Sequence, residues 1–188
     1  MLELKDGFVL YHGSYCEVKA PDLAKCAKRK DFGQGFYLTT SKEQAESFLR
    51  TSIAKAIATG TIEEGQKFGY ISTFEFKFSG NLETLIFENA DVDWLHCIAA
   101  HRKKKMFIEV EREMARYDII AGKIADDATN ATLTAYLAGA FGTAGDKEAD
   151  DFCIRQLLPN KLKDQYCFKT ESAIRCLKFV KGEKIWLK

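Results

Sequence analysis

The sequence predicts an α+β fold with strands near both ends of the chain and helices between them. Short runs rich in aromatic and β-branched residues, which are typical of strands, occur at 8–12, 36–40 and 165–169. Apolar residues at helical spacing occur between these runs, most clearly at 41–60 and 91–101. Because strands and helices do not alternate regularly, a doubly wound parallel sheet is not expected.

The predicted elements of the first half have recognisable boundaries. The apolar run 8–12 ends at the Gly-Ser pair 13–14, which is typical of a turn. Ser41 is a suitable N-cap for the helix that follows the second strand, and Gly60 is a suitable end. In 74–78, phenylalanine alternates with charged residues, which predicts a strand with one solvated face.

The rest of the chain predicts a series of short elements by the same criteria. In order, they are a strand at 85–87, a helix at 91–101, a strand at 117–120, helices at 126–141 and 146–158, a strand at 165–169, a helical turn at 171–176 and a closing strand or hairpin at 177–187 with Gly182 at its turn. No repeat, low-complexity tract or linker interrupts the pattern, so residues 1–188 are expected to form a single domain.

Composition and charge favour a soluble protein. The formal net charge is +1 over 188 residues, so global charge does not indicate a class of partner. The N-terminus has no basic region followed by an apolar stretch, and no apolar run reaches the ~18 residues of a membrane span. The six cysteines form no CxxC pair, which predicts reduced thiols, a cytoplasmic protein and no metal site.

Three segments far apart in the chain each combine a predicted strand with polar or aromatic residues. They are Leu-Tyr-His-Gly-Ser at 10–14, Asp-Phe-Gly-Gln-Gly-Phe-Tyr-Leu-Thr at 31–39 and Asp-Gln-Tyr-Cys-Phe at 164–168. In this order, they resemble the ADP-ribosyltransferase superfamily, in particular its His–Tyr–Glu branch, which includes diphtheria-type toxins and poly(ADP-ribose) polymerases. The resemblance is closest to a group of small bacterial proteins of this fold, and it covers the chain from Leu10 to about Phe179.

The resemblance implies both a fold and an activity. The implied fold has split mixed and antiparallel sheets, with helices inserted between the N- and C-terminal strands and NAD⁺ bound in the cleft as co-substrate. The implied activity is transfer of ADP-ribose from NAD⁺ to a macromolecular acceptor, protein or nucleic acid, with release of nicotinamide. By analogy of fold alone, a small transferase of this kind suggests a toxin or defence module with a neutralising partner protein.

Two of the implied roles belong to the first motif. His12 is expected to hydrogen-bond a ribose hydroxyl, since one ring nitrogen can donate while the protein holds the other. Gly13 lacks a Cβ, so the nicotinamide carboxamide can approach its backbone closely. The alternative is that His12 is a core histidine and Gly13 a turn residue.

The second motif is expected to hold the nicotinamide ring. Tyr37 matches the family's stacking residue, and an aromatic face attracts a cationic ring. Because Phe36 and Tyr37 point to opposite faces of a strand, one is expected in the core and Tyr37 toward the ligand. His12, Tyr37 and Gln165 are the expected catalytic residues. The expected NAD⁺ contacts further include Ser14, Arg29, Phe32, Gly33 and Gly35.

Gln165 departs from the family pattern, in which this position is Glu. A Gln side chain accepts a hydrogen bond from a ribose hydroxyl, but it carries no charge and cannot serve as a general base. Three explanations are open. The acceptor is already a good nucleophile, or another acidic residue supplies the charge (Glu171, Asp126 or Asp127), or NAD⁺ binds without turnover. We favour active transfer; the alternatives are a non-catalytic NAD⁺ or ADP-ribose sensor, an NAD⁺ glycohydrolase, and an interaction module that has lost the site.

Two basic runs each allow two interpretations. The loop 25–30, which includes Arg29, either contacts the pyrophosphate of NAD⁺ or is simply solvated. The run 102–105 follows a predicted helix, where cations complement the helix dipole, and this explanation is favoured over a nucleic-acid patch.

Overall fold

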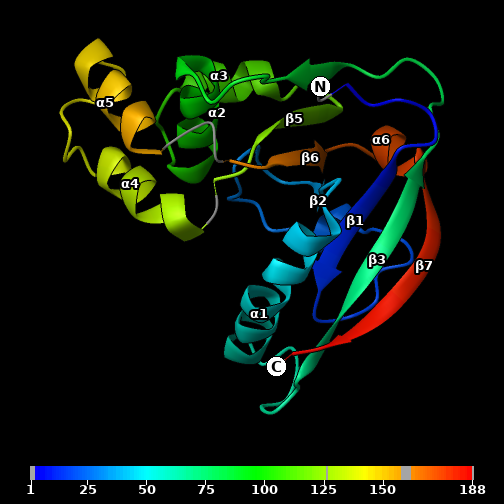
Figure 1. The fold of residues 1–188 in the computed structure, drawn as a ribbon. Coiled ribbons are helices and arrows are strands. Elements are labelled where there is room, and N and C mark those ends of the chain that lie inside the picture. The colour runs from blue at the N-terminus through cyan, green and yellow to red at the C-terminus, as the bar shows by residue number, and fades with distance from the viewer. Residues whose placement is uncertain (1–2, 126, 158–161, 188) are drawn as a thin grey trace.

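The structure is a computed structural model that describes residues 3–125, 127–157 and 162–187. Within these residues it confirms the α+β class and shows an antiparallel sheet and a mixed sheet (Figure 1). The antiparallel sheet has the order β1-β3-β7, with β1 at Val9–Ser14, β3 at Phe68–Phe76 and β7 at Leu177–Trp186. The mixed sheet has the order β2-β6-β5-β4, with β2 at Phe36–Leu38, β6 at Asp164–Phe168, β5 at Ile119–Lys123 and β4 at Thr84–Ile86. In it, β4 and β5 run parallel and the other pairs antiparallel.

The helices cover different parts of the two sheets. They are α1 (Lys42–Ala58), α2 (Val92–Arg102), α3 (Ile108–Met114), α4 (Asp127–Leu137), α5 (Lys147–Leu157) and α6 (Glu171–Arg175), with a short 3-10 helix η1 at Leu23–Lys25. In Figure 1, α2 to α5 lie together at one end of the molecule, whereas α1 lies beside β1. The predicted N-cap of α1 is confirmed, because the Ser41 hydroxyl accepts a hydrogen bond from the Gln44 N–H at 3.2 Å.

The two sheets meet where β1 passes the end of β2. Tyr11 and Thr39 exchange both backbone hydrogen bonds, at 2.8 and 3.0 Å, in an isolated antiparallel bridge. On its other edge, β1 pairs with β3 along its whole length. The bridge fixes the first and second motifs side by side, because one lies on β1 and the other leads into β2.

Apolar clusters on either side of the mixed sheet hold these elements in place. One packs α2, α4 and α5 against the sheet around Trp94 and Ile98. Another fills the space between the two sheets around Phe74 and Phe168, and a smaller one packs Leu49 of α1 against β3. Full burial of one such side chain contributes about 1.5–3 kcal/mol, so the clusters give the three motif segments a rigid support.

Of the two alternatives predicted for the closing segment, a strand or a hairpin, the strand is confirmed and the turn at Gly182 is wrong. β7 is one continuous strand with a bulge at Val180, where the register with β3 shifts between Thr73 and Phe74. Gly182 lies within the strand, and a Cβ there would be 1.9 Å from Oε1 of Glu17. This glycine therefore makes room for the Glu17 side chain and does not form a turn.

Other elements also differ from the sequence prediction. β3 begins at Phe68 and ends at Phe76, so Phe78 lies outside the strand and is 60% exposed. The helix α3 was not expected, because it is only seven residues long and carries a charged residue at most positions. Its start is set by Phe107, which has a positive φ of 50° and provides no side-chain cap.

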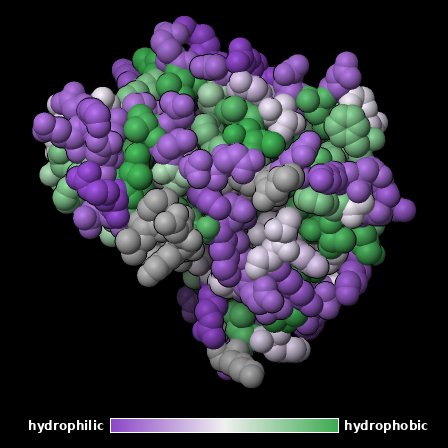
Figure 2. Space-filling model, turned by 45° about the horizontal axis from the view of Figure 1, so that its top comes forward, coloured by the Kyte–Doolittle hydropathy of each residue, from purple (hydrophilic) through white to green (hydrophobic). Residues whose placement is uncertain are grey.

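The surface view shows how the apolar residues are distributed. On the face in Figure 2, hydrophobic residues form separate patches among hydrophilic ones. Large exposed hydrophobic side chains occur on several elements and include Val9, Phe48, Ile108 and Trp186. Scattered residues of this kind are normal on a protein surface. In the part of the chain that is described, no helix has the length and apolar character needed to cross a membrane.

Candidate functional site

A cavity of about 670 Å³ lies along the edge of β1 that does not pair with β3, between the loop at 15–30 and α1. Its size falls within the roughly 300–1,000 Å³ that is usual for ligand sites. Among the residues that line it are His12, Gly13 and Ser14 from β1, Gly35 and Tyr37 from the second motif, and Gln165 from β6. Residues from all three sequence motifs therefore meet in one cavity.

His12 presents a hydrogen-bond acceptor to this cavity. Its Nδ1 lies 2.8 Å from the backbone carbonyl of Tyr37, and a carbonyl only accepts, so Nδ1 carries the proton. Burial next to Phe36, whose ring centroid is 4.4 Å away, lowers the pKa of His12 to about 4. The ring is therefore neutral at pH 7, and its Nε2 accepts. His12 was expected to be a donor from the sequence, whereas this geometry makes its Nε2 an acceptor.

Gly13 has a structural reason to lack a side chain. A Cβ at this position would lie 2.0 Å from the carbonyl oxygen of Ala45, so the glycine allows α1 to pack on β1. A ligand cannot approach from that side. Backbone groups alternate along a strand, and those of Tyr11 point to Thr39, so the N–H and C=O of Gly13 point to the same side, away from β3. These two groups face the cavity from the strand edge.

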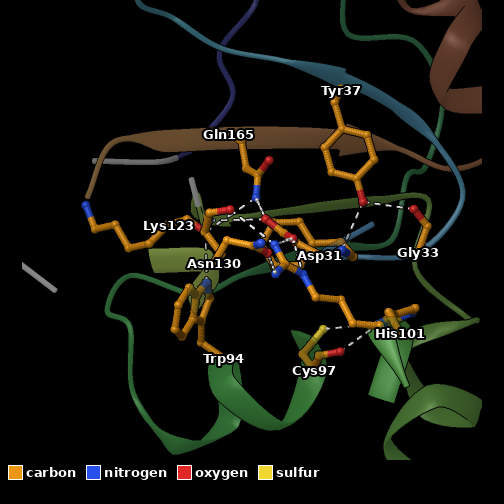
Figure 3. Close-up of polar contacts among 12 residues, drawn as sticks. Asp31, Gly33, Tyr37, Trp94, Cys97, His101, Lys123, Asn130 and Gln165 are labelled. Carbon is orange, nitrogen blue, oxygen red and sulfur yellow. Dashed lines mark hydrogen bonds and ion pairs between the residues drawn. The ribbon is translucent and has the colours of Figure 1, made fainter. Parts of the chain in front are cut away.

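Tyr37 is held rigidly by the loop that precedes it. Its hydroxyl donates to the carbonyl of Gly33 at 2.8 Å and accepts from the N–H of Phe32 at 2.9 Å (Figure 3). Burial raises the pKa of Tyr37 well above its ordinary value, so the hydroxyl remains a donor. The prediction that Phe36 and Tyr37 face opposite ways is confirmed, since Phe36 is buried between the sheets and Tyr37 packs against the other cluster.

Three of the expected NAD⁺ contacts do not line the cavity. The ring of Phe32 is fully buried and stacks on Phe87, with centroids 6.0 Å apart. Gly33 has a φ of +85°, and a Cβ there would be 2.6 Å from the ring of His101. Both residues shape the loop that holds Tyr37. Arg29 is exposed.

The cationic loop contributes to the cavity through other residues. Lys25 and Lys30 line it, in place of Arg29. Gly35 lines it as well, but a Cβ at Gly35 would lie 2.4 Å from Sγ of Cys167, so this glycine also allows β2 to pack on β6.

Gln165 is buried, and its amide has a defined orientation. Its Nε2 donates to Oδ2 of Asp31 at 2.8 Å, and the backbone carbonyl of Lys123 lies 3.5 Å from the same nitrogen (Figure 3). Both neighbours accept hydrogen bonds and donate none. The amide nitrogen therefore belongs on this side, and Figure 3 shows the carbonyl oxygen Oε1 directed away from Asp31.

Asp31 is the centre of a buried polar network behind the cavity. Its Oδ1 accepts from Nε and Nη2 of Arg102 at 2.9 and 2.6 Å, and its Oδ2 also accepts from the N–H of Ala125 at 3.2 Å. Arg102 is held further by Asn130, whose Oδ1 accepts from Nη1 at 3.1 Å. A buried ion pair is tolerated only when its hydrogen bonds are satisfied, and this one makes them on both partners.

The sequence pattern gives no direct sign of this network. Asp31 stands at the start of the second motif, but nothing in the pattern connected it to Gln165, which is 134 residues away. Arg102 was assigned with the basic run 102–105 to the dipole of α2, whereas its side chain turns inward to Asp31. The position of Asp31, directly before the loop that carries the aromatic residue, was the one available signal.

The acidic residues that could stand in for the Glu of the ADP-ribosyltransferase pattern lie in different places. Glu171 is exposed in the first turn of α6 and does not line the cavity. Asp126 lies outside the described residues, and the side chain of Asp127 is not described. The cavity wall does include Glu17 and Asp22, but these form ion pairs with neighbouring lysines.

The chain matches the model of one protein family. A family model described as "Protein of unknown function (DUF3990)" matches residues 8–179, which include all three motifs. The chain belongs to this family. Comparison with the curated proteins and with the solved structures gives no match. The chemistry of the DUF3990 cavity must therefore be inferred from its own residues.

The motif residues in the cavity wall are suited to hydrogen bonding and aromatic stacking, and they are poorly suited to proton transfer. His12 and Gln165 contribute neutral acceptors, and the edge of Gly13 contributes one donor and one acceptor. A group with a pKa of about 4 is a weak base at neutral pH, and a Gln amide is not a base. In the described part of the DUF3990 chain, no three His, Cys, Asp or Glu residues are placed to hold a metal ion.

Proposed function

We propose that this protein is an NAD⁺-dependent ADP-ribosyltransferase that transfers ADP-ribose to a macromolecular acceptor and releases nicotinamide. The observation that carries the proposal is that His12, Gly13, Tyr37 and Gln165, from three distant segments, line one cavity. The arrangement of an antiparallel and a mixed sheet around this cavity is consistent with the ADP-ribosyltransferase type of fold.

Each part of NAD⁺ has a chemically suitable partner in the cavity. The cationic nicotinamide ring suits the face of Tyr37, and its carboxamide suits the N–H and C=O of Gly13. Hydroxyls of the attached ribose donate to Nε2 of His12 and to Oε1 of Gln165. Lys25 and Lys30, which line the cavity, provide positive charge for the pyrophosphate.

The reaction follows from this placement. The bond between C1 of the ribose and the nicotinamide nitrogen breaks, and its electron pair neutralises the pyridinium. A lone pair of the acceptor then forms the new bond to C1, and any proton on the acceptor passes to solvent. Acceptor dipoles near the sugar stabilise the positive charge that develops on it. Since neither His12 nor Gln165 is a strong base at neutral pH, the acceptor is a group that is already nucleophilic, such as a phosphate or an activated base.

The test is release of nicotinamide from NAD⁺ by the pure protein, with and without a bacterial lysate as the source of acceptor. Adenine-labelled NAD⁺ shows whether the label enters macromolecules. The variant is Tyr37→Ala, and the matched control is Tyr117→Ala, a half-buried tyrosine outside the cavity. We expect release that requires lysate, accompanies labelling and is lost only in Tyr37→Ala. Binding of NAD⁺ without release in any condition would instead identify a sensor, and release without labelling a glycohydrolase.

A further inference from the structure

We propose that Asp31 is a positioning residue that fixes the amide of Gln165, so that its carbonyl oxygen, and not its nitrogen, faces the cavity. The inference deepens the proposed function and rests on it for its catalytic consequence. It is carried by the 2.8 Å hydrogen bond between Gln165 Nε2 and Asp31 Oδ2, which joins a cavity residue to a buried ion pair.

An amide side chain has two nearly isosteric orientations that differ in what they offer to a ligand. With Nε2 toward Asp31, Gln165 offers the cavity an acceptor; in the reverse orientation, it offers a donor. The reverse orientation places Oε1 against a carboxylate oxygen, and two acceptors repel each other. The carbonyl of Lys123, 3.5 Å from Nε2, disfavours it as well. Asp31 thus selects the orientation that accepts from a ribose hydroxyl.

Asp31 is itself fixed, which makes it a suitable reference point. Arg102 donates twice to one carboxylate oxygen, and the N–H of Ala125 donates to the other. The hydrogen bond from Nε2 to a carboxylate also polarises the amide, and polarisation along a chain of hydrogen bonds strengthens Oε1 as an acceptor. Asp31 therefore raises the partial negative charge on Oε1, at the position where the ADP-ribosyltransferase pattern has a charged Glu.

The same short loop positions both ligand-facing side chains. Asp31 accepts a hydrogen bond from the amide of Gln165. The next two residues hold the hydroxyl of Tyr37, which accepts from the N–H of Phe32 and donates to the carbonyl of Gly33. The three consecutive residues therefore set the distance between the aromatic face and the amide oxygen. Positions 31 and 165 must be complementary, with an acid at one and an amide at the other.

Exchanging the two residue types tests this complementarity. In Asp31→Asn, the charged Arg102 retains the single amide oxygen, so the new NH₂ group faces Gln165 and forces its amide to reverse. In Gln165→Glu, two carboxylates meet at hydrogen-bond distance. In the double variant Asp31→Asn/Gln165→Glu, the Asn donates to the Glu, and a carboxylate oxygen again faces the cavity. Both variants that contain Asp31→Asn lose the hydrogen bond from the N–H of Ala125 to Oδ2 of Asp31. This loss therefore cancels when the double variant is compared with Asp31→Asn alone.

The experiment measures kcat and KM of nicotinamide release, and the thermal unfolding midpoint, for the full chain and these three variants. Asp151→Asn, which removes a surface ion pair with Lys147, is the control. We expect each single variant to lose about 10- to 100-fold in kcat, because small misplacements of a site group have effects of this size. The double variant should regain at least tenfold over Asp31→Asn and acquire an acidic limb in its pH profile. If kcat of the double variant falls by the product of the two single-variant factors, the two positions act independently and the proposal is overturned.

A second measurement does not depend on turnover. The side-chain amide of Gln165 gives a ¹⁵N–¹H signal, whose protons should exchange slowly while they are bonded to Asp31. In Asp31→Asn this signal should shift and its exchange should accelerate, while the signals of α5 stay in place. An unchanged Gln165 signal would overturn the positioning role. A shifted signal in a protein that releases no nicotinamide would support the positioning role and reject the proposed function.

Discussion

Stability should fall at acidic pH because of His12. Burial lowers the pKa of this imidazole from its ordinary 6.5 to about 4, and the positive charge of Lys30 acts in the same direction. The hydrogen bond from Nδ1 to the Tyr37 carbonyl opposes these effects only partly. In the unfolded chain His12 takes up a proton near pH 6.5, whereas in the folded protein it stays neutral until about pH 4.

The sign and size of the effect follow from this difference. Between pH 6.5 and 4 the unfolded state binds more protons, so stability is complete above this window and is lost as the pH falls through it. At about 1.36 kcal/mol for each pKa unit, lowering the pH from 7.5 to 4.5 should cost about 2.5 kcal/mol of unfolding free energy through this group. For a chain of this size, that corresponds to a fall of roughly 5–10 °C in the unfolding midpoint.

The assay is urea unfolding at pH 7.5 and 4.5 for the wild type and for His12→Asn. The Asn amide nitrogen replaces Nδ1 as donor to the Tyr37 carbonyl but does not titrate, and every other titrating group is shared. Between pH 7.5 and 4.5, the free energy of unfolding of the wild type should fall by about 2.5 kcal/mol more than that of His12→Asn. Equal losses in the two proteins would refute the argument. NAD⁺ affinity gives an independent check, because protonation turns Nε2 from an acceptor into a donor and should weaken binding below about pH 4.

Three further substitutions test other parts of the structure. Gly13→Ala places a Cβ against the carbonyl of Ala45, and we expect a loss of about 1–3 kcal/mol, measured by thermal unfolding. Tyr37→Phe keeps the ring but removes both hydrogen bonds of the hydroxyl, so calorimetry should show weaker NAD⁺ binding, with a stability loss of about 1–3 kcal/mol. Asp150→Asn removes a buried acceptor that bonds His96 at 2.7 Å and should cost about 1–3 kcal/mol in urea unfolding without changing NAD⁺ affinity. An unchanged unfolding midpoint in Gly13→Ala would contradict its assignment. The same holds for an unchanged NAD⁺ affinity in Tyr37→Phe and for an altered NAD⁺ affinity in Asp150→Asn.

Those features of the fold that depend on local pattern were predictable from the sequence. The helix α1 begins after Ser41 because a hydroxyl N-cap and a helical apolar stripe occur together there. The opposite placement of Phe36 and Tyr37 follows from strand geometry alone. The convergence of the three motifs on one cavity was expected from the resemblance, since no local rule brings residues 12 and 165 together.

Features that depend on distant neighbours were not predictable. Gly182 looks like a turn residue until Glu17 is seen to occupy the space of its Cβ. Gly13 looks like a ligand-binding glycine, yet Ala45 of α1 requires the same residue. Arg102 looks like part of a solvated basic run, and only its partner Asp31, 71 residues away, shows why its side chain turns inward. In each case the reason for the residue type is a contact with a residue far away in the chain, which no local pattern shows.

The neutral side chains of His12 and Gln165 also predict how the protein treats water. A water molecule must lose a proton to attack C1 of the ribose, and a carboxylate at the position of Gln165 would assist it. Here Gln165 has no charge, Asp31 is buried behind it in an ion pair, and the pKa of His12 is about 4. We therefore expect transfer to a nucleophilic acceptor to exceed hydrolysis of NAD⁺ by at least about tenfold, a ratio that free and acceptor-linked ADP-ribose measure directly. In Asp31→Asn/Gln165→Glu the carboxylate moves into the cavity, and hydrolysis should rise relative to transfer. A wild type that hydrolyses NAD⁺ as fast without acceptor would show that a base is present and that this view of the wall is wrong.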